Sequence, residues 1–156
     1  MSKNTKLSIF SILLFVLLLL WYSMIFVEIP ALTTEGRAGL ISPYGLLELL
    51  LLGILTGYLL RWKGADYAGL IVLGLWSYLQ YNANWKYLFA KAPKEKLESY
   101  YQHFENTLRF FPESDTYIIP DAYHMVLGIL LLTNLIITII KIIQKFRQKK
   151  LKISVG

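Results

Sequence analysis

The chain contains no cysteine, which excludes disulfide bonds, thiolate catalysis and cysteine-bound metals. Charge is also scarce: 17% of its 156 residues are Asp, Glu, Lys or Arg, whereas 56% are hydrophobic. No catalytic, cofactor-binding or nucleotide-binding motif is present. The chain is too apolar for a soluble domain of this size, and we expect neither a cofactor nor a metal site.

The sequence is instead rich in long apolar segments. A bilayer core about 30 Å thick needs about 20 apolar residues in each spanning helix. Segments 7–27, 44–62, 67–85 and 122–143 meet that need and leave short connections and one longer loop. The first segment is longer than the apolar core of a secretion signal, so we interpret it as a retained anchor. The prediction is an all-α integral membrane protein in which residues 1–156 form one domain, a bundle of four transmembrane helices.

The distribution of charge predicts which side of the membrane each connection faces. Most of the basic residues lie in the N-terminus, in the turn at 61–66 and from Lys141 onward, including the tail at 144–156. Most of the acidic residues lie in the other two connections. Because cytoplasmic segments are enriched in Lys and Arg, both termini are predicted to be cytoplasmic, in a multi-pass protein of the cell (inner) membrane. The basic tail should attract anionic lipid headgroups rather than nucleic acid. The composition, rich in Lys, Ile and Tyr, fits an AT-rich bacterium.

The longer outer loop carries the spacing of an amphipathic helix. From Leu97 to Phe111, apolar residues recur at intervals of three and four, as on one face of a helix. Pro93 suits a first turn and Pro112 ends the run. We predict a helix over 93–111 that lies in the outer interface or caps the bundle.

Each predicted span contributes a polar group near its outer end. Polar residues inside a membrane are costly, so each needs a partner or a function. One interpretation is that they hydrogen-bond one another or reach water; the other is a small vestibule that binds a ligand. The residues of this polar layer are Glu28, Glu48, Asn82, Asn84, Asp121 and His124.

Small residues mark where helices could approach closely. Gly53 and Gly57 form a G-x-x-x-G step in the second span, and Ala65 and Gly69 form a similar step at the start of the third. Close backbone approach helps to hold membrane helices together. These residues could pack within one bundle, or the Gly53 and Gly57 face could join two copies in a homo-oligomer.

Three functional hypotheses follow from these features. The first is a non-enzymatic binding or accessory protein whose extracytoplasmic face engages a protein, peptide or lipid. The second is an oligomeric transporter or channel for a small solute or ion, with Glu48 as its carboxylate. The third is a lipid-modifying enzyme that uses Glu48, Asp121 and His124 as acid–base groups.

Overall fold

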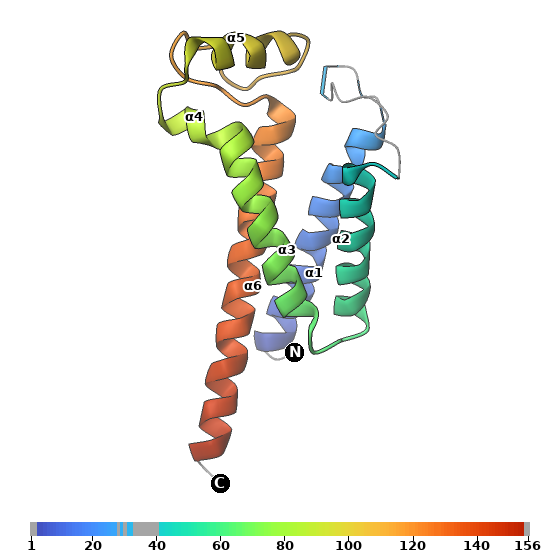
Figure 1. Ribbon diagram of the computed structural model, residues 1–156. Coiled ribbons are helices and arrows are strands. Elements are labelled where there is room, and N and C mark those ends of the chain that lie inside the picture. The colour runs from blue at the N-terminus through green and yellow to red at the C-terminus, as the bar shows by residue number, and fades with distance from the viewer. Residues whose placement is uncertain (1–2, 28, 30, 33–40, 155–156) are drawn as a thin grey trace.

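The computed structural model describes residues 3–27, 29, 31–32 and 41–154. Every regular element in these ranges is a helix (Figure 1). In chain order the helices are α1 (Lys3–Tyr22), the 3₁₀ helix η1 (Ser23–Phe26), α2 (Pro43–Leu59), α3 (Ala65–Gln80), the π-helix η2 (Tyr81–Trp85), α4 (Lys86–Phe89), α5 (Lys94–His103) and α6 (Ala122–Ser154).

Within the described residues, two helices are long and apolar enough to cross a membrane. They are Leu7–Phe26, which covers most of α1 together with η1, and Ala122–Gln148 in α6. The other two predicted spans correspond to shorter helices, since α2 has 17 residues and α3 has 16. On length and composition, the structure thus supports two of the four predicted spans.

The four longest helices pack side by side. α6 contacts α1 and α3, and α2 contacts the same two helices. α5 lies across one end of these helices, and the N- and C-termini both lie at the other end (Figure 1). We call these the α5 end and the terminal end. The core between the helices consists mainly of large apolar side chains, of which the most buried are Phe15, Leu18, Ile25, Leu51, Leu73, Leu127 and Leu131.

Local sequence explains the tight turn between α2 and α3. The Trp62 N–H donates to the Gly57 carbonyl oxygen (2.8 Å) and the Arg61 N–H to that of Tyr58 (3.1 Å). These two bonds form the Schellman motif, which satisfies carbonyl groups at a helix C-terminus. The motif places Arg61 in the left-handed region, with φ of 55°, where glycine is the usual residue.

The predicted outer-loop helix is present but shorter than expected. It was predicted over 93–111, whereas α5 ends at His103 and Phe104 leaves the helical conformation with φ of −107° and ψ of 26°. Leu97 and Phe104 are buried, as an amphipathic face requires, but Leu108 is exposed. The apolar spacing beyond Phe104 therefore belongs to a non-helical segment.

Hydrogen bonds to Tyr101 and Arg109 explain why the helix stops. The Tyr101 hydroxyl accepts bonds from the backbone N–H groups of Ser114 (3.1 Å) and Ile119 (3.2 Å) and donates to the Tyr117 carbonyl. Arg109 donates to the Phe104 carbonyl oxygen at 2.9 Å, which supplies a partner that a continuing helix would have provided. Hydrogen bonds from side chains thus replace the backbone hydrogen bonds that a longer helix would have made.

The last helix is longer than expected. The tail at 144–156 was predicted as an extension beyond the final span, but α6 continues without a break to Ser154. No proline or glycine occurs between Gly128 and Gly156, so the sequence holds no strong signal to end the helix.

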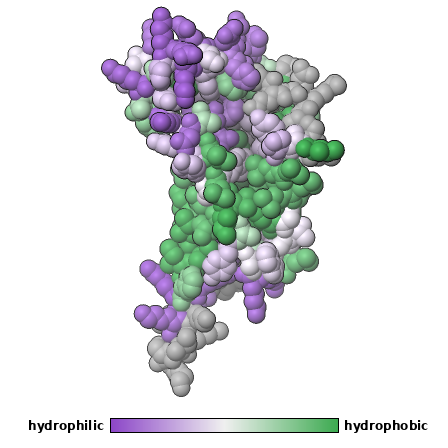
Figure 2. Space-filling model, viewed as in Figure 1, coloured by the Kyte–Doolittle hydropathy of each residue, from purple (hydrophilic) through white to green (hydrophobic). Residues whose placement is uncertain are grey.

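The surface is divided into zones along the helices. On the face drawn in Figure 2, hydrophobic side chains form a band across the middle, between hydrophilic zones at the α5 end and the terminal end. The shorter helices contribute to the exposed apolar surface through Leu46, Leu49, Leu50, Ile71, Leu75 and Leu79.

Candidate functional site

A cavity of about 610 Å³ lies between the helices near the α5 end. Its walls come from α1 and η1, α2, α3 and η2, with α5, Phe104 and the start of α6 completing the lining. The lining combines aromatic rings with a few polar side chains, and we call it the aromatic cavity: Tyr22, Tyr44, Trp76, Tyr100 and Phe104 are the aromatic members, and Gln80, Asn84 and His124 are the polar ones.

Contacts between aromatic residues fix one wall of the aromatic cavity. The Tyr22 ring packs edge-to-face on Trp76, with centroids 4.8 Å apart. The Tyr22 hydroxyl donates to the Tyr44 carbonyl oxygen at 3.1 Å. One tyrosine of α1 is therefore joined to both α2 and α3.

Asp121 positions His124 at the edge of the aromatic cavity. The Asp121 carboxylate caps α6, because its Oδ1 accepts a bond from the His124 backbone N–H at 3.0 Å. Its Oδ2 lies 2.6 Å from His124 Nδ1. An ionised carboxylate can only accept, so the geometry assigns a proton to Nδ1; in the tautomer with its single proton there, Nε2 is the acceptor.

Asp121 remains a carboxylate at neutral pH. It is only 1% exposed, and this burial opposes ionisation. The hydrogen bond from the His124 ring, together with the backbone N–H groups, outweighs that cost and holds the pKa of Asp121 below its usual 3.8. The pair therefore keeps a negative charge behind the imidazole.

Neighbouring rings hold the His124 imidazole in place. Phe104 and Tyr123 pack edge-to-face on it, with centroids 5.2 and 5.3 Å away. Tyr123 in turn stacks on Trp21, whose Nε1 donates to the Tyr123 carbonyl oxygen at 3.1 Å. The hydrogen bond to Asp121 uses Nδ1 of His124, and Nε2, on the other side of the ring, could accept a bond from a ligand.

The two asparagines of the predicted polar layer both lie in the π-helix η2, but they have different environments. Asn84 is buried, lines the aromatic cavity and donates to Gln80 Oε1 at 2.7 Å. Asn82 is exposed, donates to the Tyr78 carbonyl oxygen and borders a different cleft beneath α5, together with Lys96. π-Helical turns are rare and frequently occur at functional sites. The cavity thus brings Asn84 and His124 together and leaves Asn82 outside.

Glu48 lies beside the aromatic cavity without lining it. It is 7% exposed, and its Oε1 is 2.9 Å from the Ser23 hydroxyl, which is also 2.6 Å from the Leu19 carbonyl oxygen. Its Oε2 has no partner among the described residues. Tyr44 and Leu47 of the same helix do line the cavity. Glu28 lies outside the described residues.

Of the small residues predicted to pack helices together, three lie at the contact between α2 and α3 and one lies on the surface. A side chain at Gly57 would lie 3.2 Å from the Ala65 Cβ atom, and one at Gly69 would overlap the Tyr58 hydroxyl. By contrast, a side chain at Gly53 would meet nothing within 4 Å. Gly57, Ala65 and Gly69 thus lie where α2 and α3 approach each other, and Gly53 lies on the open face of α2.

Sequence reasoning overlooked the aromatic part of the site. Tyr22, Tyr44 and Trp76 lie on three different helices, and no sequence pattern joins them because single aromatic residues are common in apolar helices. No group of three or more His, Asp or Glu side chains with metal-binding geometry occurs within the described residues. No family model, curated protein or solved structure matches the chain. The functional argument therefore depends on the geometry of the aromatic cavity.

Proposed function

We propose that the protein spans a membrane four times, with α2 and α3 crossing alongside α1 and α6. α2 is about 26 Å long at 1.5 Å per residue, close to the bilayer core of about 30 Å. α3, η2 and α4 follow one another without interruption from Ala65 to Phe89. Both shorter helices expose leucines, as helices facing lipid would.

The charges support one orientation for this arrangement. Arg61, Lys63 and the basic residues at the end of α6 lie at the terminal end, whereas α5 and its acidic neighbours lie at the other. The preference of Lys and Arg for cytoplasmic segments then assigns the terminal end to the cytoplasm. In this orientation the aromatic cavity opens near the outer surface of a cell membrane.

Within this frame, we propose that the protein is a non-enzymatic binding protein for a membrane lipid, held in the aromatic cavity. The observation that carries this proposal is the position of the lining residues Tyr44 and Leu79. They line the cavity but are also 42% and 62% exposed. The cavity therefore reaches the surface between α2 and α3, where a lipid could enter from the side.

The polar part of the lining defines the kind of lipid. A lipid already in the bilayer gains little from apolar walls, because its acyl chains leave an equally apolar environment. Selection must therefore come from hydrogen bonds and shape. Nε2 of His124 accepts, while Asn84 both donates and accepts. These groups suit a headgroup with hydroxyl or ammonium donors.

A pair of asparagine variants tests this function. Asn84→Leu removes the amide that lines the cavity, and Asn82→Leu removes an amide two residues away that does not. The loss of one hydrogen bond, about 1 kcal/mol, weakens binding roughly fivefold or more. Native mass spectrometry of protein released from bilayer nanodiscs measures the lipid that remains bound.

The expected result is a specific lipid retained by the wild type and by Asn82→Leu, with reduced retention by Asn84→Leu. Equal retention by the two variants would contradict binding in the aromatic cavity. A wild-type protein that retains no lipid, but captures a soluble peptide at its α5 end, would replace the lipid by a peptide ligand.

The Asp121–His124 pair favours a second candidate, a lipid-modifying enzyme with His124 as general base. A base held by a carboxylate within hydrogen-bond distance matches the usual arrangement for proton abstraction. However, the described lining contains no serine or threonine hydroxyl, so water or a headgroup hydroxyl would have to be the nucleophile. Conversion of labelled lipid by the wild type and its loss in His124→Gln would favour this candidate over simple binding.

A further inference from the structure

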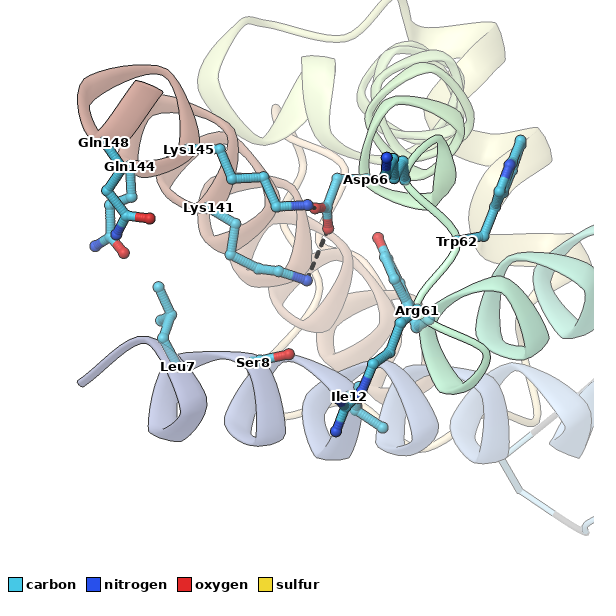
Figure 3. A pocket seen from close by; sticks show the side chains of 12 residues that line it. Leu7, Ser8, Ile12, Arg61, Trp62, Asp66, Lys141, Gln144, Lys145 and Gln148 are labelled. Atoms are coloured by element: carbon cyan, nitrogen blue, oxygen red, sulfur yellow. Dashed lines mark hydrogen bonds and ion pairs between the residues drawn. The ribbon is translucent and has the colours of Figure 1, made fainter. Parts of the chain in front are cut away.

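A second pocket, of about 270 Å³, lies at the terminal end (Figure 3). It is bordered by the start of α1, by the turn between α2 and α3, and by the last part of α6. We call it the basic pocket because four of its lining residues are cationic and only one is acidic: Arg61, Lys63, Lys141 and Lys145 against Asp66.

Asp66 organises two of these cations but cannot neutralise the pocket. Its Oδ1 lies 2.7 Å from Lys141 Nζ, and its Oδ2 pairs with Lys145. Figure 3 shows both lysines extending from α6 toward this carboxylate. Lys141 is held further by Ser11, whose Oγ is 3.1 Å from Nζ. One buried carboxylate therefore fixes two ammonium groups and leaves an excess of positive charge.

The remaining donors are available to a ligand. Arg61 and Lys63 are exposed and have no acidic partner among the described residues. The Lys145 side chain is 56% exposed although it contacts Asp66. Gln144 also lines the pocket (Figure 3) and adds an amide donor. Guanidinium, ammonium and amide donors around one small space match the acceptor oxygens of a phosphate group.

The surroundings favour a phosphate that is attached to a lipid. Leu7 and Ile12 form an apolar part of the wall, and Trp62, which is 60% exposed, lies at the same pocket. Tryptophan favours the headgroup layer of a membrane. In the proposed membrane orientation, the pocket lies at the cytoplasmic headgroup level, with charged donors next to apolar surface.

We propose that the basic pocket is a specific site for the phosphate of an anionic lipid headgroup in the cytoplasmic leaflet. This inference depends on the proposed membrane orientation but not on ligand binding in the aromatic cavity. It goes beyond general attraction of a basic tail to anionic lipid, because it assigns the phosphate to the donors of one pocket.

Arg61, in the turn between α2 and α3, can be replaced without an expected loss of stability. Arg61→Gly removes the guanidinium while placing the preferred residue at a position with φ of 55°. Its thermal stability should equal or exceed that of the wild type, so a binding defect would not reflect unfolding. Lys63→Gln removes a second exposed cation from the lining. Arg147→Gln is the matched control, because Arg147 is an exposed cation of α6 outside the pocket.

The experiment is native mass spectrometry of protein released from nanodiscs that contain phosphatidylglycerol and phosphatidylcholine. The wild type and Arg147→Gln should retain phosphatidylglycerol in preference to phosphatidylcholine. Arg61→Gly should lose this preference by about tenfold, as expected for one contact to a charged group, and Lys63→Gln should show a smaller loss.

Two results would overturn the proposal. Equal losses in Arg61→Gly and Arg147→Gln would show that the attraction is spread over all basic residues of this end. Binding of inorganic phosphate by the purified protein, with no preference between the two lipids, would show that the source is free phosphate. Asn84→Leu should leave the phosphatidylglycerol preference unchanged, which keeps failure here distinct from failure at the aromatic cavity.

Discussion

Replacing Asp66 by asparagine should destabilise the protein, because this carboxylate is the only acidic partner of the buried Lys141 ammonium among the described residues. Asp66 is 3% exposed and Lys141 is 9% exposed. After the substitution, Lys141 Nζ has only neutral partners: the new amide oxygen, the Ser11 hydroxyl at 3.1 Å and the face of the Tyr58 ring, whose centroid is 4.4 Å away. Lys145, with a side chain that is 56% exposed, can turn toward water at little cost.

The magnitude follows from leaving one ammonium buried without its counter-charge. Removing one partner of a buried ion pair costs about 3–5 kcal/mol. Because only one of the two lysines here is buried, we expect the lower limit, about 3 kcal/mol, or roughly a hundredfold in the unfolding equilibrium constant. Reversible unfolding in mixed detergent micelles, followed by circular dichroism, measures this change.

Two further variants make this measurement decisive. Asp66→Asn combined with Lys141→Met removes the unpaired ammonium and should recover most of the lost stability, since the two residues are directly coupled. Asp115→Asn removes an exposed carboxylate and should change stability by less than about 0.5 kcal/mol. An Asp66→Asn variant as stable as Asp115→Asn would refute the reasoning.

Two other predictions concern packing and pH. Gly69→Ala should destabilise the protein by roughly 1–3 kcal/mol, because the new methyl group would overlap the Tyr58 hydroxyl. Gly53→Ala is the control, because its methyl group meets no atom within 4 Å and should not destabilise the protein. If copies associate through Gly53, as the transporter hypothesis requires, Gly53→Leu should shift the oligomeric state measured by light scattering. Asp121 should make stability fall below about pH 4. Burial opposes its ionisation, but its hydrogen-bond partners hold its pKa below the usual 3.8, so its contribution is complete above that pH and lost as pH falls through the folded value. A denaturation profile that is flat from neutral pH to pH 2 would contradict the pH prediction.

The sequence predicted the helical class and the main apolar segments because both depend on local pattern. Residues 7–27 and 122–143 are long, predominantly apolar segments, and the structure has long helices at both. The end of α5 could not be predicted in this way. It is set by Tyr101, whose hydroxyl bonds to Ser114 and Ile119, and such contacts between distant residues leave no periodic signal.

The candidate sites were predictable to different degrees. The Asp121 and His124 pair, three residues apart, could be recognised as neighbours on one helix face, and the structure joins them at 2.6 Å. The contact of Asp66 with Lys141 and Lys145 joins α3 to α6 across a long stretch of sequence. This contact could not be predicted from sequence alone, because nothing local reveals a buried partner on another helix.

The most direct test of the central claim, four membrane crossings with the α5 end outside, uses the absence of cysteine. Single cysteines introduced at Glu98 in α5 and at Lys63 in the turn between α2 and α3 would each be the only thiol in the chain. Intact cells are treated with a membrane-impermeant maleimide. We predict that Glu98→Cys is labelled and that Lys63→Cys is labelled only after the cells are opened. If only α1 and α6 crossed the membrane, both sites would lie outside, so labelling of Lys63→Cys in intact cells would contradict the account.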